Sequence, residues 1–426
     1  MKKLLSITLI VLLLASLFVG CTNDEPKTDE GTTQNETNKE ETKDEPKEEV
    51  STEKQVIKFA AQADSTPATQ AVIDAFNSSQ EEFVVEWVEF TNDSAQMHDQ
   101  LITSLSSGSD EYDVLSMDVV WAGEFAGAGY IEPLDVKMSE AGINAADYNA
   151  GSMTAGNYKG KQYTLPFFSD LGLLYYRSDI VSAEEAAVLE SGDYTYADLA
   201  AMAEKYVGEG GTDFGFVYQS KQYEGLTCNV TEFTKGYTDI EAGLETMKTF
   251  TEASWTPEDI LNYTEGETHT QFTEGKAVFA RNWPYQYGII KGEESPLTPE
   301  QTGVAPLPNG GTVGGWLLGL NKNSDVAEGA WTFLQFVTGT EGQKIMATQG
   351  GYLPGYNVVL SDEEVKANNE MLQFDGFQKA LTSTLSRPVS PEYSKTSDEV
   401  QVNTHKYLSG SSDLESTVAA LENSLK

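Results

Sequence analysis

The sequence predicts an α/β fold of two lobes, joined by crossings of the chain that leave a cleft between them. Three observations support this class. Strand-like and helix-like segments alternate after residue 54, as they do in helix-covered sheets. The same stretch is long enough to form two hydrophobic cores. Two apolar segments that contain Pro or Gly, at 163–170 and 314–321, are placed to carry the chain between the lobes.

The first lobe is expected to begin with three strands and two helices. The run QVIKFAA at 55–61 is strand-like, and the sequence STP at 65–67 is typical of a helix start with a hydroxyl cap and a proline in the first turn. Further elements are expected as a strand at 83–90, a helix at 97–105 and a strand at 112–117. This order favours a parallel sheet, in which ligands bind beyond the carboxyl ends of the strands, here at the Asp64–Thr66 turn and Asp118.

The second lobe shows the same mixed pattern, without an internal repeat. Strands are expected at 215–219 and 277–282, and helices at 196–206 and 240–252. A further helix is expected at 327–338, after the second crossing. The two crossings, YTLPFFSD and GGWLLGLN, would form a hinge, and closure of a hinge over a cleft is a common switching geometry. A plain Gly-rich loop is the alternative interpretation of the second crossing.

The N-terminus is typical of a secretory signal that ends at a lipid attachment site. Lys2 and Lys3 precede an uncharged, mostly apolar run, and the small residue Gly20 stands before Cys21. This pattern resembles the bacterial lipobox, with Phe18 where Leu is usual. It predicts a signal peptide over 1–20 and a lipidated Cys21. An uncleaved membrane anchor is the alternative, because the apolar run is near the lower length limit for a span.

The stretch that follows is expected to be a disordered acidic tether over 21–54. It contains hardly any apolar residue, and acidic residues outnumber basic ones. Such a segment cannot bury enough surface to offset its chain entropy. The tether would hold the folded domain outside the cell membrane, to which the lipid anchors it on the extracytoplasmic face.

Charge and cysteine content exclude several classes of function. The formal net charge is −40, so nucleic acid is not an expected partner, because its binding requires clustered Lys and Arg. After Cys21 only Cys228 remains, so no disulfide forms within the domain, and Cys228 is expected to be a small buried residue. The three histidines, at 98, 269 and 405, are far apart in sequence, and no metal or cofactor is predicted.

Several segments match motifs that occur together in one family. They are DVVW at 118–121 followed by EFAGAGYIEPLD at 124–135, LPFFSDLGLLYYR at 165–177, YQSKQYEGLTCN at 218–229, ARNWPY at 280–285, GVAPLP at 303–308, GGW at 314–316 and RPVSPEY at 387–393. Together, and in this order, they resemble the extracellular solute-binding proteins of sugar ABC importers, most of all the trehalose/maltose-binding branch.

The resemblance implies a two-lobed, periplasmic-binding-protein-like fold of type II. It places 55–168 and about 319–372 in the N-terminal lobe, and 169–318 and about 373–426 in the C-terminal lobe. The implied function is that of a monomeric substrate-binding lipoprotein without a cofactor. By hinge closure it would capture a disaccharide or small oligosaccharide, similar to trehalose or maltose, and deliver it to the membrane permease subunits of an importer.

The resemblance also implies which polar residues bind the sugar. Asp118 and Asp170 should each accept hydrogen bonds from a pair of hydroxyls, and the Arg387 guanidinium should donate to sugar oxygens. Ser65 and Gln96 lie near the expected cleft edge and are weaker candidates. From the residues alone, Asp118 could instead be a turn or helix cap, and Arg387 could pair with an acid of this acidic protein.

Aromatic residues are expected to contact the apolar faces of the sugar rings. By resemblance, Trp283 and Tyr285 form a stacking wall, and Trp316 is a second platform presented by Gly314 and Gly315. Phe168 stands where the trehalose/maltose branch has Tyr, and the lost hydroxyl leaves the identity of the disaccharide open. Without the resemblance, Trp283 could equally be an ordinary core residue.

Two other classes of function are alternatives to solute binding. An extracellular glycoside-processing enzyme could use Asp118 and Asp170 as its pair of carboxyl groups. However, the sequence contains no nucleophile elbow, zinc-protease motif or phosphate loop, and its resemblance is to binding proteins. A surface adhesin would not need two hinged lobes. The sequence therefore favours a binder that is not an enzyme.

Overall fold

The computed structural model describes residues 54–387 and 392–426. Residues from Glu53 to the C-terminus form one compact unit. The predicted signal peptide, the lipid attachment at Cys21 and all of the tether except Lys54 lie outside the described residues. Along the described ranges, none of the helices is both long enough and apolar enough to cross a membrane.

The first lobe is built on a mixed sheet of six strands among the described residues. Its strands, with β6 beside β11 and the others in the spatial order β12-β11-β3-β1-β2, are β1 (Gln55–Gln62), β2 (Phe83–Phe90), β3 (Val114–Asp118), β6 (Thr164–Leu171), β11 (Gly311–Leu320) and β12 (Thr384–Leu385). Strand β1 is parallel to β2 and β3, as predicted. The sheet is mixed because β11 runs antiparallel to both β3 and β6.

Helices cover both faces of this sheet, and each face has its own core. On one face Phe59 and Phe76 pack edge-on against Phe333, with ring centroids 5.2 and 5.1 Å apart. On the other face Met97 and Leu101 are buried in a second cluster. The helices of this lobe include α1 (Ala68–Ser79), α2 (Ser94–Ser106), α3 (Ala122–Ala128), α4 (Asp135–Glu140), α5 (Ala150–Ala155), α12 (Ala327–Thr338) and α13 (Thr340–Gly350).

The start of α1 differs in detail from the prediction. Pro67 stands immediately before the helix rather than within its first turn, and it provides no side-chain cap. The Asp64 carboxylate accepts from the Thr69 backbone N–H at 3.0 Å, and the Thr66 hydroxyl accepts from Ala68 at 3.3 Å. The predicted helix start is confirmed, but Asp64 shares the capping role expected of a hydroxyl alone, because its side chain reaches the backbone N–H of the second helical residue.

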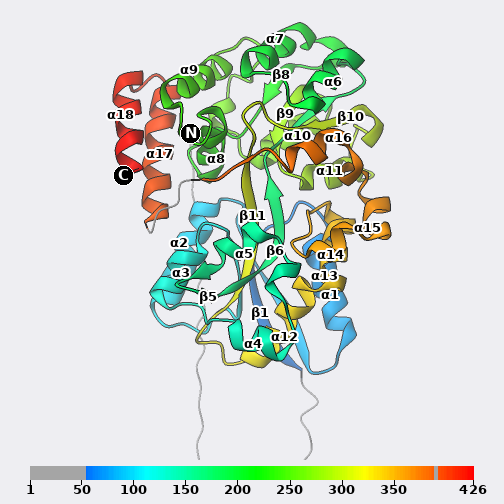
Figure 1. The fold of residues 1–426 in the computed structure, drawn as a ribbon, viewed down its shortest axis with the longest axis vertical. Coiled ribbons are helices and arrows are strands. Elements are labelled where there is room, and N and C mark those ends of the chain that lie inside the picture. The colour runs from blue at the N-terminus through cyan, green and yellow to red at the C-terminus, as the bar shows by residue number, and fades with distance from the viewer. Residues whose placement is uncertain (1–53, 388–391) are drawn as a thin grey trace, which may run out of the picture. The chain divides into compact units, whose positions relative to one another are not determined.

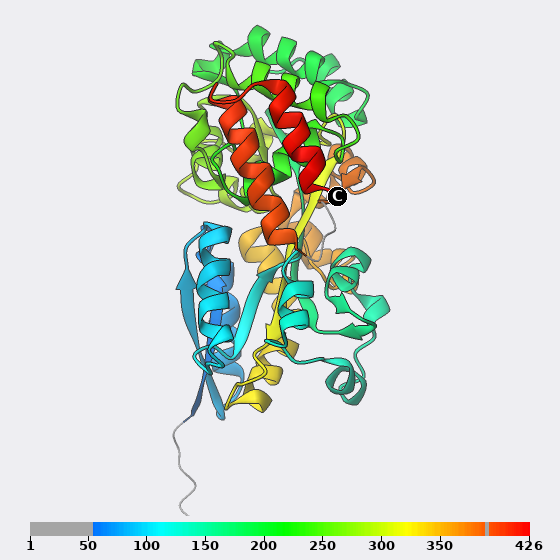
Figure 2. The same cartoon turned by 90° about the vertical axis from the view of Figure 1, so that its left-hand side faces the viewer.

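The second lobe contains a four-stranded mixed sheet in the described part of the chain. The strands, in the order β10-β7-β9-β8, are β7 (Leu173–Arg177), β8 (Phe214–Val217), β9 (Ala277–Asn282) and β10 (Thr302–Ala305). The surrounding helices include α6 (Ala183–Ser191), α7 (Tyr196–Tyr206), α8 (Glu224–Phe233), α9 (Ile240–Thr251), α10 (Glu265–Thr273), α11 (Tyr285–Ile290), α16 (Asp375–Ala380), α17 (Tyr393–Leu408) and α18 (Leu414–Ser424). Figure 2 shows α17 and α18, in orange and red, packed on this lobe.

Two strands of the first sheet carry the chain between the lobes (Figure 1). Strand β6 continues through Gly172 into β7 of the second sheet, and β11 returns after β10. The two crossings pass so closely that a Cβ on Gly311 would lie 1.9 Å from the Gly172 carbonyl oxygen. On its other side, a Cβ on Gly172 would lie 2.2 Å from Glu232 Oε1 of α8, whose side chain is held in a buried ion pair. Both positions therefore require glycine. The predicted hinge crossings are confirmed, whereas the predicted residue boundaries of the lobes stay a prediction.

Candidate functional site

One cleft brings together residues from both lobes. Of the predicted site residues, the following line it: Ser65, Asp118, Phe168, Asp170, Trp283, Tyr285, Gly314, Gly315, Trp316 and Arg387. Gln96 is not part of the lining. It lies on the exposed first turn of α2, where its backbone N–H donates to the Asp93 cap. Position along the chain suggested that Gln96 was near the cleft edge, but the rotation of the helix directs this position to solvent.

The pairing of the crossing strands explains why distant residues meet in the cleft. In β6, Phe168 and Asp170 are two residues apart and share one face of the strand. In the register of β11, Trp316 lies opposite both Phe168 and Asp118, and Gly314 lies opposite Asp170. The sheet therefore brings Asp118, Asp170 and Trp316 close together on three neighbouring strands.

Glycine in β11 makes room for the cleft wall. A Cβ on Gly314 would lie 3.0 Å from the Trp283 ring, so the indole packs directly on the backbone there. Gly315 has φ of 119°, and a Cβ at this position would lie 2.7 Å from the Phe168 carbonyl oxygen. Only glycine adopts this backbone conformation without strain. The two glycines thus permit the close approach that positions Trp283 and Trp316.

A buried ionic network links the two lobes across the cleft. The Arg387 guanidinium donates to both carboxylate oxygens of Asp118, at 2.6 and 3.2 Å, and to Glu224 Oε1 at 2.7 Å. Asp118 ends a strand of the first sheet, whereas Glu224 begins α8 of the second lobe. In this structure Arg387 pairs with an acid, which is the alternative interpretation of this residue, and the predicted roles of Asp118 and Arg387 in sugar binding stay predictions.

Glu224 is held by further donors. Ser397 donates to its Oε2 at 2.6 Å, and the Tyr393 hydroxyl donates to its Oε1. Burial raises the pKa of Glu224, and the Arg387 charge opposes that rise. Glu224 thus accepts from three donors, one of which is the Arg387 cation, and these compensate its buried charge in this arrangement of the lobes.

Polar groups fix the aromatic wall in place. The Trp283 indole N–H donates to Glu265 Oε1 at 3.2 Å, and Glu265 Oε2 accepts from the Tyr223 hydroxyl at 2.6 Å. The Tyr285 hydroxyl lies 3.0 Å from His269 Nδ1. Side chains held in this way lose little further entropy when a ring stacks on them.

A second aromatic ring, that of Tyr352, lies beside Phe168 in the cleft. The Tyr352 ring lies 4.4 Å from the Phe168 ring, and the Tyr352 hydroxyl donates to Asp64 at 2.7 Å. Tyr352 lines the cleft. A phenol hydroxyl is thus present near Phe168, but it comes from a different segment of the chain.

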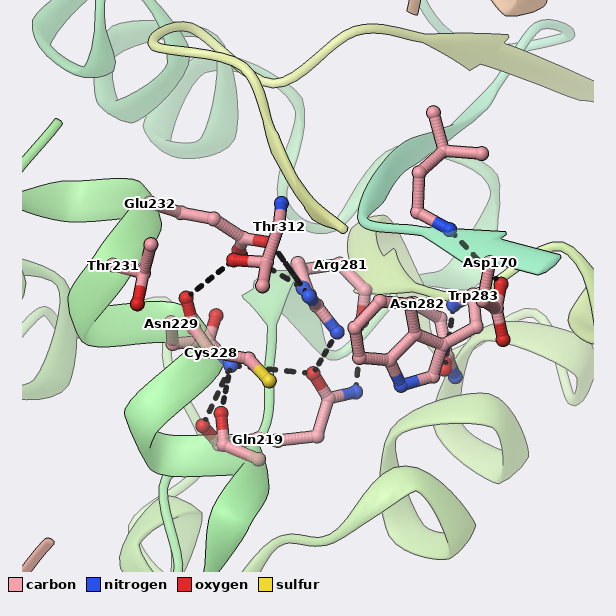
Figure 3. Close-up of polar contacts among 12 residues, drawn as sticks. Asp170, Gln219, Cys228, Asn229, Thr231, Glu232, Arg281, Asn282, Trp283 and Thr312 are labelled. Atoms are coloured by element: carbon pink, nitrogen blue, oxygen red, sulfur yellow. Dashed lines mark hydrogen bonds and ion pairs between the residues drawn. The ribbon is translucent and has the colours of Figure 1, made fainter. Parts of the chain in front are cut away.

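Behind Trp283 lies a second buried ion pair (Figure 3). The Arg281 guanidinium centre is 3.9 Å from the Trp283 ring centroid, and it donates to Glu232 and to Gln219 Oε1. The side chains of Arg281 and Glu232 are each 1% exposed. The cation therefore supports the inner face of the indole, while its outer face is left for the cleft.

Asp170 is the least compensated acid in the cleft. Its carboxylate accepts one hydrogen bond, from the backbone N–H of Leu171 at 3.1 Å, among the described residues. Burial raises the pKa of Asp170 well above its ordinary value, which the Leu171 bond and the Arg281 charge only partly oppose. The Asp170 carboxylate can therefore accept further hydrogen bonds from a ligand. When it is ionised, its burial destabilises the folded state.

We expect Asp170→Asn to stabilise the protein in a pH-dependent manner. An acid whose pKa is raised by folding stabilises fully below its unfolded pKa, and that contribution is lost as the pH rises through the folded value. Asn keeps the shape and the Leu171 bond without a charge. The melting temperature of the variant should therefore exceed that of the wild type by a margin that grows from about pH 4 upward and then levels off. A margin that stays constant with pH would contradict a raised pKa.

The cleft includes residues that sequence reasoning did not select. Among them are Tyr223, Glu224, Glu265, His269 and Tyr352. Tyr223 and Glu224 lie in one of the family-like segments and follow strand β8, which was a usable signal. Glu265 and His269 are four residues apart and share a face of α10, but nothing local marked that helix as a cleft wall. Within residues 54–387 and 392–426, no cluster of three or more His, Cys, Asp or Glu side chains could hold a metal ion.

Comparison with known proteins places this geometry in a family. Residues 71–373 match the model of the bacterial extracellular solute-binding proteins. A probable ABC transporter-binding protein of Deinococcus radiodurans is 27% identical over 69% of this chain and 74% of its own length. A maltotriose-binding protein of Pyrococcus abyssi is 27% identical over 64% of this chain and 60% of its own length.

Solved structures agree with this assignment. The maltose-bound MalE3 of T. maritima superimposes with a TM-score of 0.78 and 27% identity, covering 87% of this chain and 98% of that one. The two-lobed fold and the family model thus agree, and the match extends over more than half of the sequence. The chain belongs to the bacterial extracellular solute-binding protein family.

Proposed function

We propose that this protein is the substrate-binding component of a carbohydrate ABC importer and that it captures a disaccharide or small oligosaccharide of the maltose or trehalose type. The observation that carries the proposal is the convergence of flat aromatic side chains and carboxylates on one cleft between two hinged lobes. A sugar ring needs acceptors at its rim and flat apolar surface at its faces. The maltotriose-binding relative and the maltose-bound structural neighbour support the same class of ligand.

The individual roles follow from the cleft geometry. Asp170, with its single hydrogen bond, accepts from sugar hydroxyls. Trp283 and Trp316 contact the ring faces, with Tyr285 extending the wall of the second lobe. Asp118 and Arg387 bind the sugar rim from within their ion pair. Asp118 Oδ1 already accepts from Arg387 and from the Val120 backbone N–H, so the further hydrogen bond goes to Oδ2, which accepts only from Arg387 among the described residues. Phe168 and its neighbour Tyr352 close the cleft on the β6 side.

The cleft carries more acids than cations, which favours an uncharged ligand. Asp118, Asp170, Glu224 and Glu265 line it, against the single guanidinium of Arg387 among the described lining residues. An anionic sugar, such as a sugar acid or sugar phosphate, would meet several carboxylates in a region of low dielectric. Neutral sugars carry no such penalty.

Loading and release take place by hinge motion. The free volume of the cleft is about 110 Å³, below the roughly 300–1,000 Å³ of typical small-molecule sites. The lobes therefore move apart to admit the sugar, which then favours the closed form by its higher affinity for it. The closed, loaded protein docks on the permease subunits. A lipid on Cys21 would hold the monomer at the cell membrane, close to these permease subunits.

The alternative of a glycoside-processing enzyme receives less support. Such an enzyme needs one carboxyl group that is protonated and free to donate to the leaving oxygen. Burial raises the pKa of Asp170 in that direction. Asp118, however, is engaged by Arg387 through both carboxylate oxygens, so it is a poor nucleophile or base.

A thermal-shift screen tests the proposed function. Trehalose, maltose and sucrose come first, followed by a panel of mono- and disaccharides. A ligand at 100 times its Kd should stabilise the protein by about 2.7 kcal/mol and raise the melting temperature visibly, without release of glucose. Absence of a shift with every sugar would contradict the proposal, and release of glucose from maltose or trehalose would support the enzyme instead.

A further inference from the structure

The two lobes also meet outside the sugar cleft. Glu124 lies in the first turn of α3 in the first lobe, and Ser394 is the second residue of α17 in the second lobe. The Ser394 hydroxyl donates to Glu124 Oε2 at 2.8 Å. Figure 2 shows the lower end of α17, in orange, where that helix reaches the first lobe. Neither residue lines the cleft, so this contact joins the lobes without occupying the space that we assign to the ligand.

The first-lobe side of this contact is fixed by its surroundings. His98 Nε2 of α2 lies 3.0 Å from the same Glu124 oxygen that accepts from Ser394. The His98 ring is buried and packs edge-on against Trp121, with ring centroids 5.1 Å apart. The hydrogen bond from His98 lowers the pKa of Glu124, which keeps the carboxylate charged. Ser394 therefore donates to a charged acceptor that is already held in place, and charge-assisted hydrogen bonds are stronger than neutral ones.

The second-lobe side lies on a chain segment that crosses to the first lobe at two points. Arg387 bonds to Asp118 at the end of β3 within the cleft, and Ser394 bonds to Glu124 just after β3 and outside the cleft. Ser394 also stands at the N-terminus of a helix of 16 residues. A helix N-terminus carries a partial positive charge, so the Glu124 carboxylate is favourably placed against it when the lobes are together.

We infer that the contact between Ser394 and Glu124 is a latch that stabilises the closed arrangement of the lobes and sets the affinity for every sugar by a common factor. This inference rests on the proposed function, in which the sugar binds the closed form more tightly. When the free protein is mostly open, a bond that forms only on closure lowers the apparent Kd for each ligand equally. When the free protein is mostly closed, the same bond keeps it compact. The latch thus contributes affinity without contributing selectivity.

The variant Ser394→Ala tests the latch in the full chain, because it removes the hydroxyl and leaves the pair of His98 and Glu124 in place. Calorimetry should show that the Kd values for maltose and for trehalose rise by the same factor, about fivefold, which corresponds to about 1 kcal/mol. If the free protein is mostly closed, small-angle X-ray scattering without sugar should instead show a larger radius of gyration than in the wild type. Ser394→Thr keeps the hydroxyl and should restore the wild-type values of both quantities.

Ser416→Ala is the matched control. Ser416 is exposed in the first turn of α18 on the second lobe, where its backbone N–H bonds to the Asp413 cap. The control should leave the Kd values and the radius of gyration unchanged. For Ser394→Ala, a loss of affinity confined to one sugar would mean that Ser394 contacts the ligand, and an unchanged Kd together with an unchanged radius would mean that the lobes close without the latch. Either result overturns the inference and leaves the proposed function standing.

Absence of binding by every sugar of the thermal-shift panel would overturn the proposed function alone. The radius of gyration of Ser394→Ala then decides the inference. An increase over the wild type supports a latch between the lobes, and an unchanged radius overturns it.

Discussion

Replacing Arg281 by methionine is expected to lower the free energy of unfolding by about 3–5 kcal/mol, the largest stability loss predicted for this protein. Arg281 donates to Glu232 from two nitrogens, and both side chains are almost fully buried. Without the guanidinium, the one donor to the Glu232 carboxylate that the described residues still provide is the Thr312 backbone N–H, at 2.9 Å (Figure 3). One neutral donor cannot compensate a buried carboxylate. Urea denaturation of variant and wild type measures the difference.

The double variant Arg281→Met with Glu232→Gln is the control for this prediction. Removing the second charge should recover most of the lost stability, because a buried neutral pair costs far less than a lone buried ion. A single variant that loses less than about 1 kcal/mol would show that Glu232 finds another partner or takes up a proton at little cost. The single variant should also bind sugar less well, since Arg281 supports the inner face of Trp283.

Replacing Trp283 by alanine is expected to weaken sugar binding about 100-fold, or by about 2.7 kcal/mol. The indole presents its outer face to the cleft and is fixed by Glu265 on one edge and by Arg281 beneath. Its loss removes both the buried apolar area and the preformed stacking surface. Calorimetry with the sugar that gives the largest thermal shift measures the change in Kd.

Trp331→Ala is the matched control, because Trp331 is a partly buried tryptophan that packs against the first-lobe core and does not line the cleft. It should lower the melting temperature without a change in Kd. The circular dichroism of Trp283→Ala should match that of the wild type. An unchanged affinity in Trp283→Ala would show that the stacking role belongs to another residue.

Most of the predicted site residues could be found from the sequence because they lie on strands or directly after them. Phe168 and Asp170 share a face of β6, and the GGW motif of β11 pairs with that strand. Their convergence follows from strand periodicity and from the crossing of the chain between lobes. Gln96 shows the limit of this reasoning, because successive residues of a helix point in very different directions. A position one residue away from the cleft-facing side therefore faces solvent instead.

Local sequence by itself determined the alternating elements, the parallel start of the first sheet and the two glycine-rich or proline-containing crossings. These properties depend on propensities and on spacing within a few residues. Only the tertiary structure decided that β11 lies antiparallel between β3 and β6, that Arg387 pairs with Asp118 across 269 residues, and that His269 and Tyr352 form part of the wall. Such contacts arise from the packing of distant segments, and no short-range pattern encodes which partner a buried charge will meet.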